Sequence, residues 1–452
     1  MINQNTTFVK TNTEFSVAIK ELGIGKLLRS SNITKSCGIS AFEVFQFLLL
    51  LVFQGKNLYR FLNSKRKELA VSKNTYYRFL NNSTYNWRRF LLSLSAQVIC
   101  KFSTLTRPER VKAFVLDDSV LARNRSKNVE LLAKIYDHVE HRFKRGFTLL
   151  TLGWTDGYSF IPVSFNALSS AKKENRVQEI SNQLDRRTNG FKTRKESMLK
   201  KTEAAVLMIK RALDAGIQAD YVLMDTWFTT EPMIKEIRSL GLDVIGMVKQ
   251  LKQRYHFQGK LYTLPELSTI VKYDNKKSIF GSLLVRTKCG IPVKVVFVRN
   301  RNKRSECLYV LSTNCSISDD EIVRIYGNRW SIECFFKASK SCMKLGTEFQ
   351  SRSYDATVCH TTIVFTRYII LEWIRRNQND QKTYGELFYM FCDDIQDIDF
   401  DNALKSLMAL FVEQLTGLPV DIIKVIKCKV SEWISSQASF IKALFGDFCW
   451  ES

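Results

Sequence analysis

A segment in the second half of the chain, Tyr326 to Lys344, carries one carboxylate within a series of cations. The polar side chains recur every three or four residues, at Tyr326, Arg329, Glu333, Lys337, Lys340 and Lys344. On an α-helix this spacing places all six within about 80° of one another, and Trp330, Cys334 and Phe335 turn to the opposite, apolar face. A basic face with a single Glu suits a site that holds a metal and a phosphate backbone together. A solvated surface helix with several lysines is the alternative for this segment alone.

Two further acidic motifs each follow a short apolar segment that predicts a buried strand. Ala113–Leu116 precedes Asp117 and Asp118, and a second apolar run ends at Asp225. Taken singly, an Asp at a strand end is typical of a turn or a helix cap. Together with Glu333, these carboxylates can converge on two divalent cations about 4 Å apart, which activate a water and stabilise the leaving oxygen in phosphodiester chemistry.

These motifs resemble those of the DDE transposases of bacterial insertion sequences. In one large branch of that family, the third carboxylate lies in a Tyr-x2-Arg-x3-Glu-x6-Lys signature. The spacing of that signature is matched at Tyr326, Arg329, Glu333 and Lys340. The Asp117-Asp118-Ser119 segment fits the first motif of the family with Asp117 as the catalytic residue, and Asp118 is the alternative. The segment DTWF, which starts at Asp225, resembles the second motif.

The resemblance covers roughly residues 110 to 370 and implies an α/β, RNase H-like catalytic core. It implies that Asp117, Asp225 and Glu333 are both the catalytic residues and the ligands of two Mg²⁺ or Mn²⁺ ions. The expected activity is cut-and-paste transposition: binding of terminal inverted repeats, cleavage of the DNA ends, and joining of the 3′-hydroxyls to target DNA. The expected partners are double-stranded DNA and a second copy of the chain in the synaptic complex. A nuclease without strand transfer and a catalytically silent DNA-binding protein are the alternatives.

The distribution of elements along the chain predicts five regions. Residues 1–108 read as a helical DNA-binding domain, 109–242 as the first part of the core, and 317–354 as the part with the catalytic Glu. Between the two core parts, residues 243–316 are strand-like, and the resemblance implies an all-β insertion there. Residues 355–452 read as a helical C-terminal region that contacts protein and not DNA.

Charge is unevenly distributed over these regions. The chain has a formal net charge of +24, which suggests a polyanionic partner. Residues 1–110 hold 17 Lys and Arg against 5 Asp and Glu, whereas residues 355–452 hold 9 against 14. The basic residues are especially dense in segment 184–201, where phosphate contacts are expected from Arg186, Arg187, Lys192 and Arg194. A solvated loop without ligand is the alternative.

The N-terminal region contains a candidate helix-turn-helix. Ser72 is expected to cap a helix over Lys73–Leu80, and Tyr76, Tyr77 and Arg78 would face DNA. The alternative is a helical bundle whose basic surface touches only phosphates.

Cysteine spacing and hydropathy indicate the compartment. The eleven cysteines form no CxxC pair and no zinc spacing, which is typical of reduced, mostly buried thiols in a cytosolic protein. The apolar run at residues 44–53 is too short to span a bilayer. We therefore expect a bacterial cytoplasmic protein that is associated with the nucleoid when bound to DNA.

Overall fold

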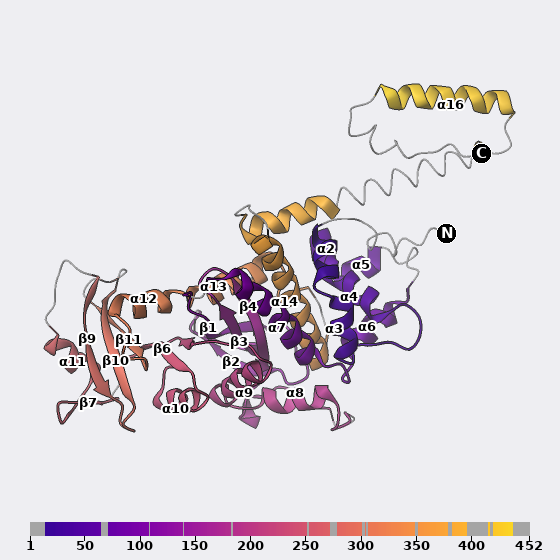
Figure 1. Cartoon of the computed structure of the whole chain (residues 1–452). Coiled ribbons are helices and arrows are strands. Elements are labelled where there is room, and N and C mark those ends of the chain that lie inside the picture. The colour runs from indigo at the N-terminus through magenta and orange to yellow at the C-terminus, as the bar shows by residue number, and fades with distance from the viewer. Residues whose placement is uncertain are drawn as a thin grey trace. The chain divides into compact units, whose positions relative to one another are not determined.

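The structure is a computed structural model of the whole chain (Figure 1). It describes residues 14–64, 71–107, 109–138, 140–181, 184–250, 253–271, 278–300, 303, 306–348, 351–377, 382–395, 415 and 419–436. The chain divides into two compact units, Met1–Leu387 and Phe388–Ser452. In the second unit, the described helix α16 spans Val420–Ser435.

The N-terminal part of the first unit is helical. Its elements are α2 (Glu14–Glu21), α3 (Ile24–Ser30), α4 (Ala41–Leu50), the 3₁₀ helix η2 (Leu51–Gln54), α5 (Leu58–Ser64), α6 (Lys73–Leu80) and α7 (Trp87–Leu105). Capping fixes where they begin: Ser40 and Glu43 form a capping box at α4, and Asn86 caps α7 by accepting from the Arg89 N–H. The 3₁₀ helix η2, which follows α4 directly, ends at Gly55, whose φ of 65° is left-handed.

The structure confirms one part of the predicted helix-turn-helix and contradicts another. Helix α6 covers Lys73–Leu80, and the Ser72 side chain caps it by accepting from the Asn74 N–H. However, Tyr76 is 2% exposed and packs on Phe47, so it does not face DNA. Arg78 is exposed and Tyr77 is half-buried. Of the preceding residues, 65–70 lie outside the described part of the chain.

A large mixed sheet follows the helices. Its strands are β1 (Ala113–Ala122), β2 (Ala133–Asp137), β3 (Arg142–Thr155), β4 (Phe160–Leu168), β5 (Tyr221–Met224), β6 (Asp243–Val248), β7 (Tyr255–Phe257), β8 (Lys260–Tyr262), β9 (Ile279–Arg286), β10 (Pro292–Arg299) and β11 (Cys307–Ser312). The described strands run in the order β2-β3-β1-β5-β6-β11-β10-β9-β7-β8, and β4 pairs with β3.

The half of this sheet that contains β1, β3, β4, β5 and β6 combines antiparallel and parallel pairing. Strands β1, β3 and β4 are antiparallel neighbours, whereas β5 and β6 add to β1 in parallel. Ala113 to Leu116 of β1 and all of β5 are buried, as expected for strands covered on both faces. This mixed α/β arrangement is consistent with an RNase H-like core.

A turn at residues 156–159 joins two antiparallel strands. Strand β3 ends at Thr155 and β4 begins at Phe160. Gly157 has a φ of 80°, and a Cβ there would meet the Asn328 side chain at 3.4 Å. The turn therefore lies against the chain just before Arg329, where glycine both accepts the left-handed conformation and leaves room.

The segment between the second and third carboxylate motifs extends the same sheet. Strand β6 continues the core in parallel with β5, and β11 pairs antiparallel with β6. Strands β7 to β10 lie beyond β11, together with helix α11 (Leu264–Ile270). The described part of residues 243–316 is thus strand-rich, as expected, but it also contains helix α11.

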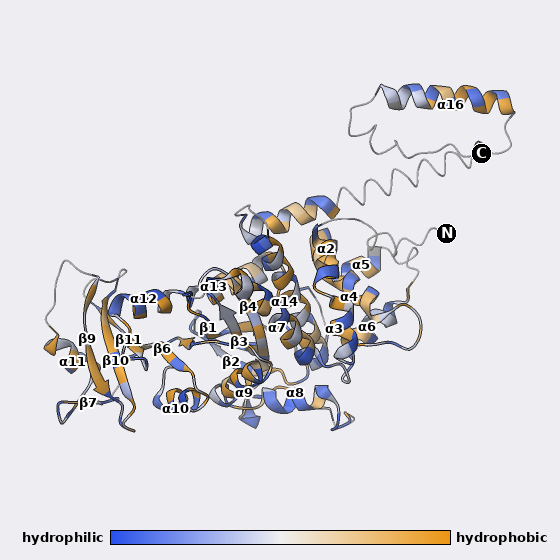
Figure 2. Cartoon of the chain, in the orientation of Figure 1, coloured by the Kyte–Doolittle hydropathy of each residue, from blue (hydrophilic) through white to orange (hydrophobic). Residues whose placement is uncertain are grey.

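Helices cover both faces of the sheet (Figure 1). They are the 3₁₀ helix η3 (Lys173–Asn175), α8 (Asn189–Ser197), α9 (Lys201–Asp214), α10 (Glu231–Ser239), α12 (Asp319–Gly327), α13 (Trp330–Ser341) and α14 (Tyr354–Asn377). Helix α14 is almost entirely buried and packs against α7, α2 and β4. Figure 2, in which the ribbon is coloured by residue hydropathy, shows strands β9 and β10 mainly hydrophobic and helix α8 mainly hydrophilic.

Arg367 explains how α14 joins the helical part to the core. It is fully buried, donates to the carbonyls of Leu48 and Leu49, and pairs with Glu348 at 2.6 Å. The sequence placed residues 355 onwards in a separate C-terminal region, whereas α14 belongs to the first compact unit.

Two further expectations concern composition. Of the ten cysteines whose burial the structure describes, only Cys359 is buried, so the prediction of mostly buried thiols is wrong. In the described part of the chain, no helix has the length and apolarity needed to cross a membrane.

Candidate active site

Strand register brings the first two acidic motifs to the same edge of the core. Strands β1 and β5 are parallel neighbours, and Leu116 pairs with Met224. Asp117 and Asp225 are the next residues of the two strands, so their backbones lie about 5 Å apart. Charge repulsion from Asp225 contributes to the raised pKa of Asp117, which agrees with this proximity. Asp225 also turns the chain, because its Oδ1 accepts from the N–H groups of Trp227 and Phe228.

The third motif is split between two helices, which corrects the single helix expected from its spacing. Helix α12 ends at Gly327 and α13 begins at Trp330. Between them, Asn328, Arg329, Ser331 and Ile332 donate to carbonyls three residues earlier, so the chain tightens into 3₁₀-type turns. Arg329 is the N-cap of α13, and Glu333 lies in its first turn.

This split also changes the apolar face. Ile332, Phe335 and Phe336 are buried, while Trp330 is 62% exposed and Cys334 is exposed. The prediction that Trp330 and Cys334 share a buried face with Phe335 is therefore wrong. The helix buries positions three and four residues apart, starting at Ile332, against α14 and β4.

Arg329 links the first and third carboxylates directly. Its Nη1 lies 3.0 Å from Asp117 Oδ2, and its Nη2 donates to Glu333 Oε1. The guanidinium also lies over the Tyr326 ring, with Cζ 6.0 Å from the centroid. Arg329 and Asp117 are each 17% exposed and Glu333 is 35% exposed, so the cluster is half-buried and open to solvent on one side.

The electrostatics of the cluster favour binding of more positive charge. Burial raises the pKa of Asp117 to about 7, despite the opposing effects of Arg329 and the Asp118 N–H. Asp225 and Asp118 raise it further through charge repulsion. Burial likewise raises the pKa of Tyr326 to about 12. The single guanidinium of Arg329 therefore does not offset the burial of Asp117 and the repulsion from its neighbouring carboxylates.

The donor set fits hard divalent cations, which prefer carboxylate oxygens. Among the described residues, however, no three His, Cys, Asp or Glu side chains form a ready metal cluster. The reason is visible in the contacts, because Arg329 lies between Asp117 and Glu333. These residues suit Mg²⁺ or Mn²⁺ once Arg329 moves from between the two carboxylates.

Adjacent residues of β1 face opposite sides of the sheet. Asp117 and Ser119 contact α13, where Lys340 donates to Ser119 Oγ at 2.6 Å. Asp118 points to α9 and pairs with Lys201 at 2.9 Å. Figure 1 shows α13 and α9 on opposite sides of the core strands. The alternation separates Asp117 from Asp118, as expected for a strand.

Lys201 also reaches the second acidic motif. Its Nζ lies 4.3 Å from the centroid of the Trp227 ring, two residues after Asp225. The same ammonium therefore ties the Asp117-Asp118 segment to the turn that follows Asp225. Sequence reasoning included Ser119 in the first motif and Lys201 in the basic segment 184–201, but it gave neither side chain a role in the site. The role of Ser119 could have been found because it lies two residues from Asp117, on the same face of the strand.

The remaining cations of the third motif differ in their surroundings. Lys337 is exposed on α13. Lys344 lies after the end of α13, has a φ of 57°, and donates to the Ser341 carbonyl at 3.1 Å. Lys344 is thus not part of the helical column that the spacing predicts.

Helix α8 lies within the basic segment 184–201, and the structure corrects the expectation for one residue of this segment. Arg186, Arg187 and Lys192 are exposed. Arg194 is 2% exposed and pairs with Glu130 and Asp355, both at 2.7 Å. Because its guanidinium is already paired with these two carboxylates, the expectation of a phosphate contact is wrong for Arg194.

Comparisons with known proteins agree with the motifs. The family described as "DDE superfamily endonuclease" matches residues 43–265, and "Transposase DDE domain" matches residues 194–370. No curated protein matches the chain. The solved structure titled "Drosophila P element transposase strand transfer complex" aligns with 90% of this chain and 92% of its own, at 10% identity. Its TM-score of 0.24 is too low to support an argument about the fold. Together the two family matches cover the segments with all three carboxylate motifs, and they support a DDE transposase.

Proposed function

We propose that this chain is a cut-and-paste DNA transposase of an insertion sequence. It binds the terminal inverted repeats of its element, cleaves the DNA ends with two divalent metal ions, and joins the 3′-hydroxyls to target DNA. Asp117, Asp225 and Glu333 are the proposed catalytic residues and metal ligands. Joining requires two ends held together, so we propose a dimer on DNA.

One observation carries the proposal: Asp117 in β1 and Asp225, directly after β5, follow the last parallel pair of these neighbouring strands, Leu116 and Met224, and Arg329 connects Asp117 to Glu333. Residues 108 positions apart in sequence, at the second and third motifs, are thereby brought to one edge of the core. The 17% exposure of Asp117 and the 35% exposure of Glu333 leave this edge accessible to a substrate. Asp118 is the weaker candidate, because its carboxylate is engaged by Lys201 on the opposite face.

The chain's own residues have distinct roles in this chemistry. Two divalent cations held by the three carboxylates would activate the attacking oxygen and stabilise the leaving oxygen. Asp117 must lose its proton to act as a ligand, and added positive charge lowers its pKa. Arg329, released from Asp117 and Glu333, is positioned to contact the phosphate of the cut end. Tyr326 lies against Arg329 and limits where its guanidinium can move.

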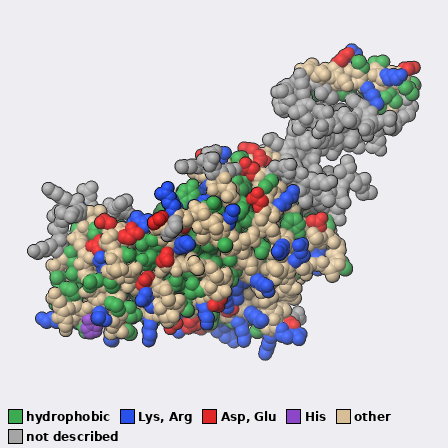
Figure 3. Space-filling view, in the orientation of Figure 1, with side chains coloured by type: hydrophobic (Ala, Val, Ile, Leu, Met, Phe, Trp, Pro, Cys, Tyr) green, Lys and Arg blue, Asp and Glu red, His purple; other side chains and the backbone are tan. Residues whose placement is uncertain are grey.

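The basic residues then position the DNA backbone. Lys337 and Lys340 lie on the same helix as Glu333, and Arg186, Arg187 and Lys192 are exposed around α8. Figure 3 shows Lys and Arg side chains gathered over the α8 region. Phosphate contacts of this kind bind DNA in register without reading its sequence.

A strand-transfer assay tests the proposal. Purified protein is incubated with Mg²⁺, a fluorescent duplex carrying the inverted repeat that flanks the coding sequence, and a target plasmid. We expect cleaved ends and joined products from the wild type, and intact end binding without either product from Glu333→Gln.

Other outcomes assign the chain differently. Cleaved ends that never join, although both ends are bound, would identify a nuclease. Binding without cleavage by the wild type would identify a silent DNA-binding protein. Joined products formed by a strict monomer would refute the dimeric synaptic complex.

A further inference from the structure

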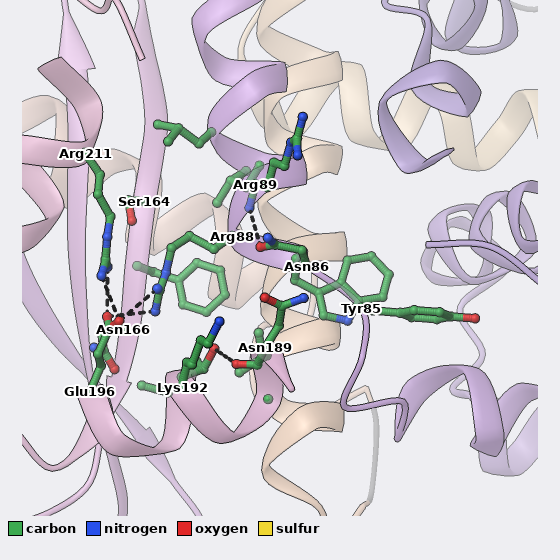
Figure 4. A pocket seen from close by; sticks show the side chains of 18 of the residues that line it. Tyr85, Asn86, Arg88, Arg89, Ser164, Asn166, Asn189, Lys192, Glu196 and Arg211 are labelled. Carbon is green, nitrogen blue, oxygen red and sulfur yellow. Dashed lines mark hydrogen bonds and ion pairs between the residues drawn. The ribbon is translucent and has the colours of Figure 1, made fainter. Parts of the chain in front are cut away.

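A cavity lies apart from the carboxylates, where the helical part of the first unit meets the core. Its volume is about 340 Å³, and α7, β4, α8, α9 and α14 all contribute to its lining (Figure 4). Arg88, Arg89, Lys192 and Arg211 line it, against the acidic residues Glu196 and Asp355. The lining therefore has two more basic than acidic side chains.

The arginines of this cavity are held in fixed orientations. Arg88 and Arg211 approach Glu196 from opposite sides, and each makes a two-pronged contact with its carboxylate (Figure 4). The four N···O distances lie between 2.7 and 3.0 Å. One carboxylate cannot neutralise two guanidinium groups, so the cluster keeps a net positive charge with N–H donors to spare.

Lys192 adds a cation that has no competing partner. It extends from α8 into the space between Arg88 and Asn189 (Figure 4). Neither Lys192 nor Arg89 forms an ion pair with any residue in the described ranges. These two charges are therefore available to an anionic ligand.

The cavity also contains buried polar groups without partners. The Asn166 side chain is 4% exposed, and its Oδ1 makes no hydrogen bond within the part of the chain that the structure describes. The indole N–H of Trp87, another lining residue, likewise has no acceptor among these residues. Buried polar groups are normally satisfied, so unpartnered ones in a cationic cavity indicate a polar ligand. Rotation of the Asn166 amide would present an N–H donor to an anion.

We propose that this cavity binds a phosphate of the DNA backbone, at a distance from the scissile phosphate. The inference rests on the proposed function and deepens it. Helix α9 links the cavity to the core strands: Lys201, at its start, contacts Asp118, and Arg211, later on the same helix, lines the cavity.

The N-terminus of α7 supports the same ligand. Arg88 and Arg89 lie in the first turn of this 19-residue helix. The positive end of the helix dipole therefore adds to the side-chain charge at the cavity.

Two neighbouring lysines of α8 give a matched test. Lys192→Gln removes a cavity charge, whereas Lys195→Gln removes an equally exposed charge that does not line the cavity. The binding of element-end duplex is measured as a function of salt. We expect Lys192→Gln to reduce the log–log salt slope by about one unit and Lys195→Gln to leave it unchanged. Equal slopes in Lys192→Gln and wild type, or equal losses in both variants, would overturn the proposal.

Phosphate ethylation interference locates the contact. We expect one ethylated phosphate, other than the scissile one, to weaken wild-type binding and to have no effect on Lys192→Gln. Asn166→Ala, which changes no charge, is expected to weaken binding with the salt slope intact. Interference that is identical in wild type and Lys192→Gln would refute the assignment.

A separate arm identifies the source of the phosphate. Inorganic phosphate and a deoxynucleoside monophosphate are titrated into the wild type and Lys192→Gln while the melting temperature is followed. Saturable stabilisation lost in Lys192→Gln, together with unchanged DNA salt slopes, would assign the cavity to a free ligand and overturn the DNA source. These measurements do not depend on cleavage. A wild type that binds duplex but never cleaves it would refute the proposed transposase activity. The salt slopes of wild type and Lys192→Gln would still test the DNA contact at the cavity.

Discussion

Two arginines in this chain each lie between two carboxylates, but the two clusters differ in almost every other respect. Arg194 is 3% exposed and joins Glu130 to Asp355, which are 14% and 8% exposed. Glu130 also accepts from the N–H groups of Tyr354 and Ser181. Arg329, by contrast, joins Asp117 to Glu333 where Glu333 is 35% exposed.

The pKa values show what this difference means. Burial acts to raise the pKa of Glu130, but Arg194 and the two N–H groups outweigh it and the net shift is downward. Burial raises the pKa of Asp355. At the other cluster, burial raises the pKa of Asp117 to about 7, and Arg329 does not offset it. The Arg194 cluster is a closed connection between elements, whereas the Arg329 cluster is short of positive charge. We infer that the first serves stability and the second serves ligand binding.

The largest effect expected is on cleavage. Asp117→Asn removes a proposed ligand and should reduce the rate of end cleavage at least about 10³-fold, since metal ions supply several kcal/mol of transition-state stabilisation. Asp118→Asn is the matched control, because Asp118 faces Lys201 and should lose less than about tenfold. Rates are measured in a single-turnover gel assay at fixed Mg²⁺. A larger loss in Asp118→Asn would exchange the roles of the two residues.

Unfolding stability should fall much more on replacement of Arg194 than on replacement of Arg329. Arg194→Met leaves Glu130 and Asp355 buried without a cation, which costs about 3 to 5 kcal/mol. Arg329→Met leaves carboxylates that reach water and should cost less than about 1 kcal/mol. Urea denaturation of both variants measures this difference, and Arg194→Lys provides a milder change that keeps the charge. Similar losses for both methionine variants would refute the functional distinction.

The pH dependence of stability should separate the clusters as well. The pKa of Asp117 is about 7 in the folded state, against the ordinary value of 3.8 for an aspartate. The folded chain therefore holds this proton where the unfolded chain has lost it, so the contribution is present below pH 3.8 and is lost as the pH rises towards 7. The full shift corresponds to up to about 4 kcal/mol. In buffer with EDTA, Asp117→Asn should lose this decline.

Glu130→Gln is the contrasting variant. The folded pKa of Glu130 is lowered, so its contribution is present above the unfolded pKa and is lost as the pH falls through the folded value. Its removal should therefore lower stability at neutral pH and leave it little changed in acid. Identical pH profiles for the two variants would contradict the pKa directions on which the comparison rests.

Much of the carboxylate site could be predicted because its information is local. A short apolar strand followed by Asp identifies β1 and β5, and the 3- and 4-residue spacing places Arg329 beside Glu333 on one helix face. Parallel pairing of two buried strands then aligns Asp117 with Asp225. The break between α12 and α13 was also signalled locally, because Gly327 and Asn328 are typical of a helix end.

The Arg194 cluster could not be predicted in this way. Its carboxylates lie 64 and 161 residues away in sequence, so no spacing links them to α8. A local composition rich in Lys and Arg suggested a phosphate-binding loop instead. One clue was Gly190 near the start of α8, where a Cβ would approach Asp355 Oδ1 to 2.4 Å. Glycine at that position indicates close approach of another element, but the sequence does not identify which element.

The smallest effect is expected at Lys201. This residue belongs to neither the Arg194 cluster nor the Arg329 cluster, but it holds the segment that carries Asp117 in the Arg329 cluster. It pairs with Asp118 at 2.9 Å and covers the Trp227 ring at 4.3 Å, so it joins the segments that carry Asp117 and Asp225.

Lys201→Met keeps the packing on Trp227 but removes the charge. Loss of such a supporting contact typically costs about 10-fold in metal affinity or activity. We expect the Mg²⁺ concentration for half-maximal cleavage to rise by about that factor, with the rate at saturating Mg²⁺ nearly unchanged. Lys200→Met, one residue earlier and exposed, is the control and should leave the Mg²⁺ requirement unaltered. A fall in the saturated rate without a change in Mg²⁺ requirement would show that Lys201 acts on the DNA and not on the positions of the carboxylates.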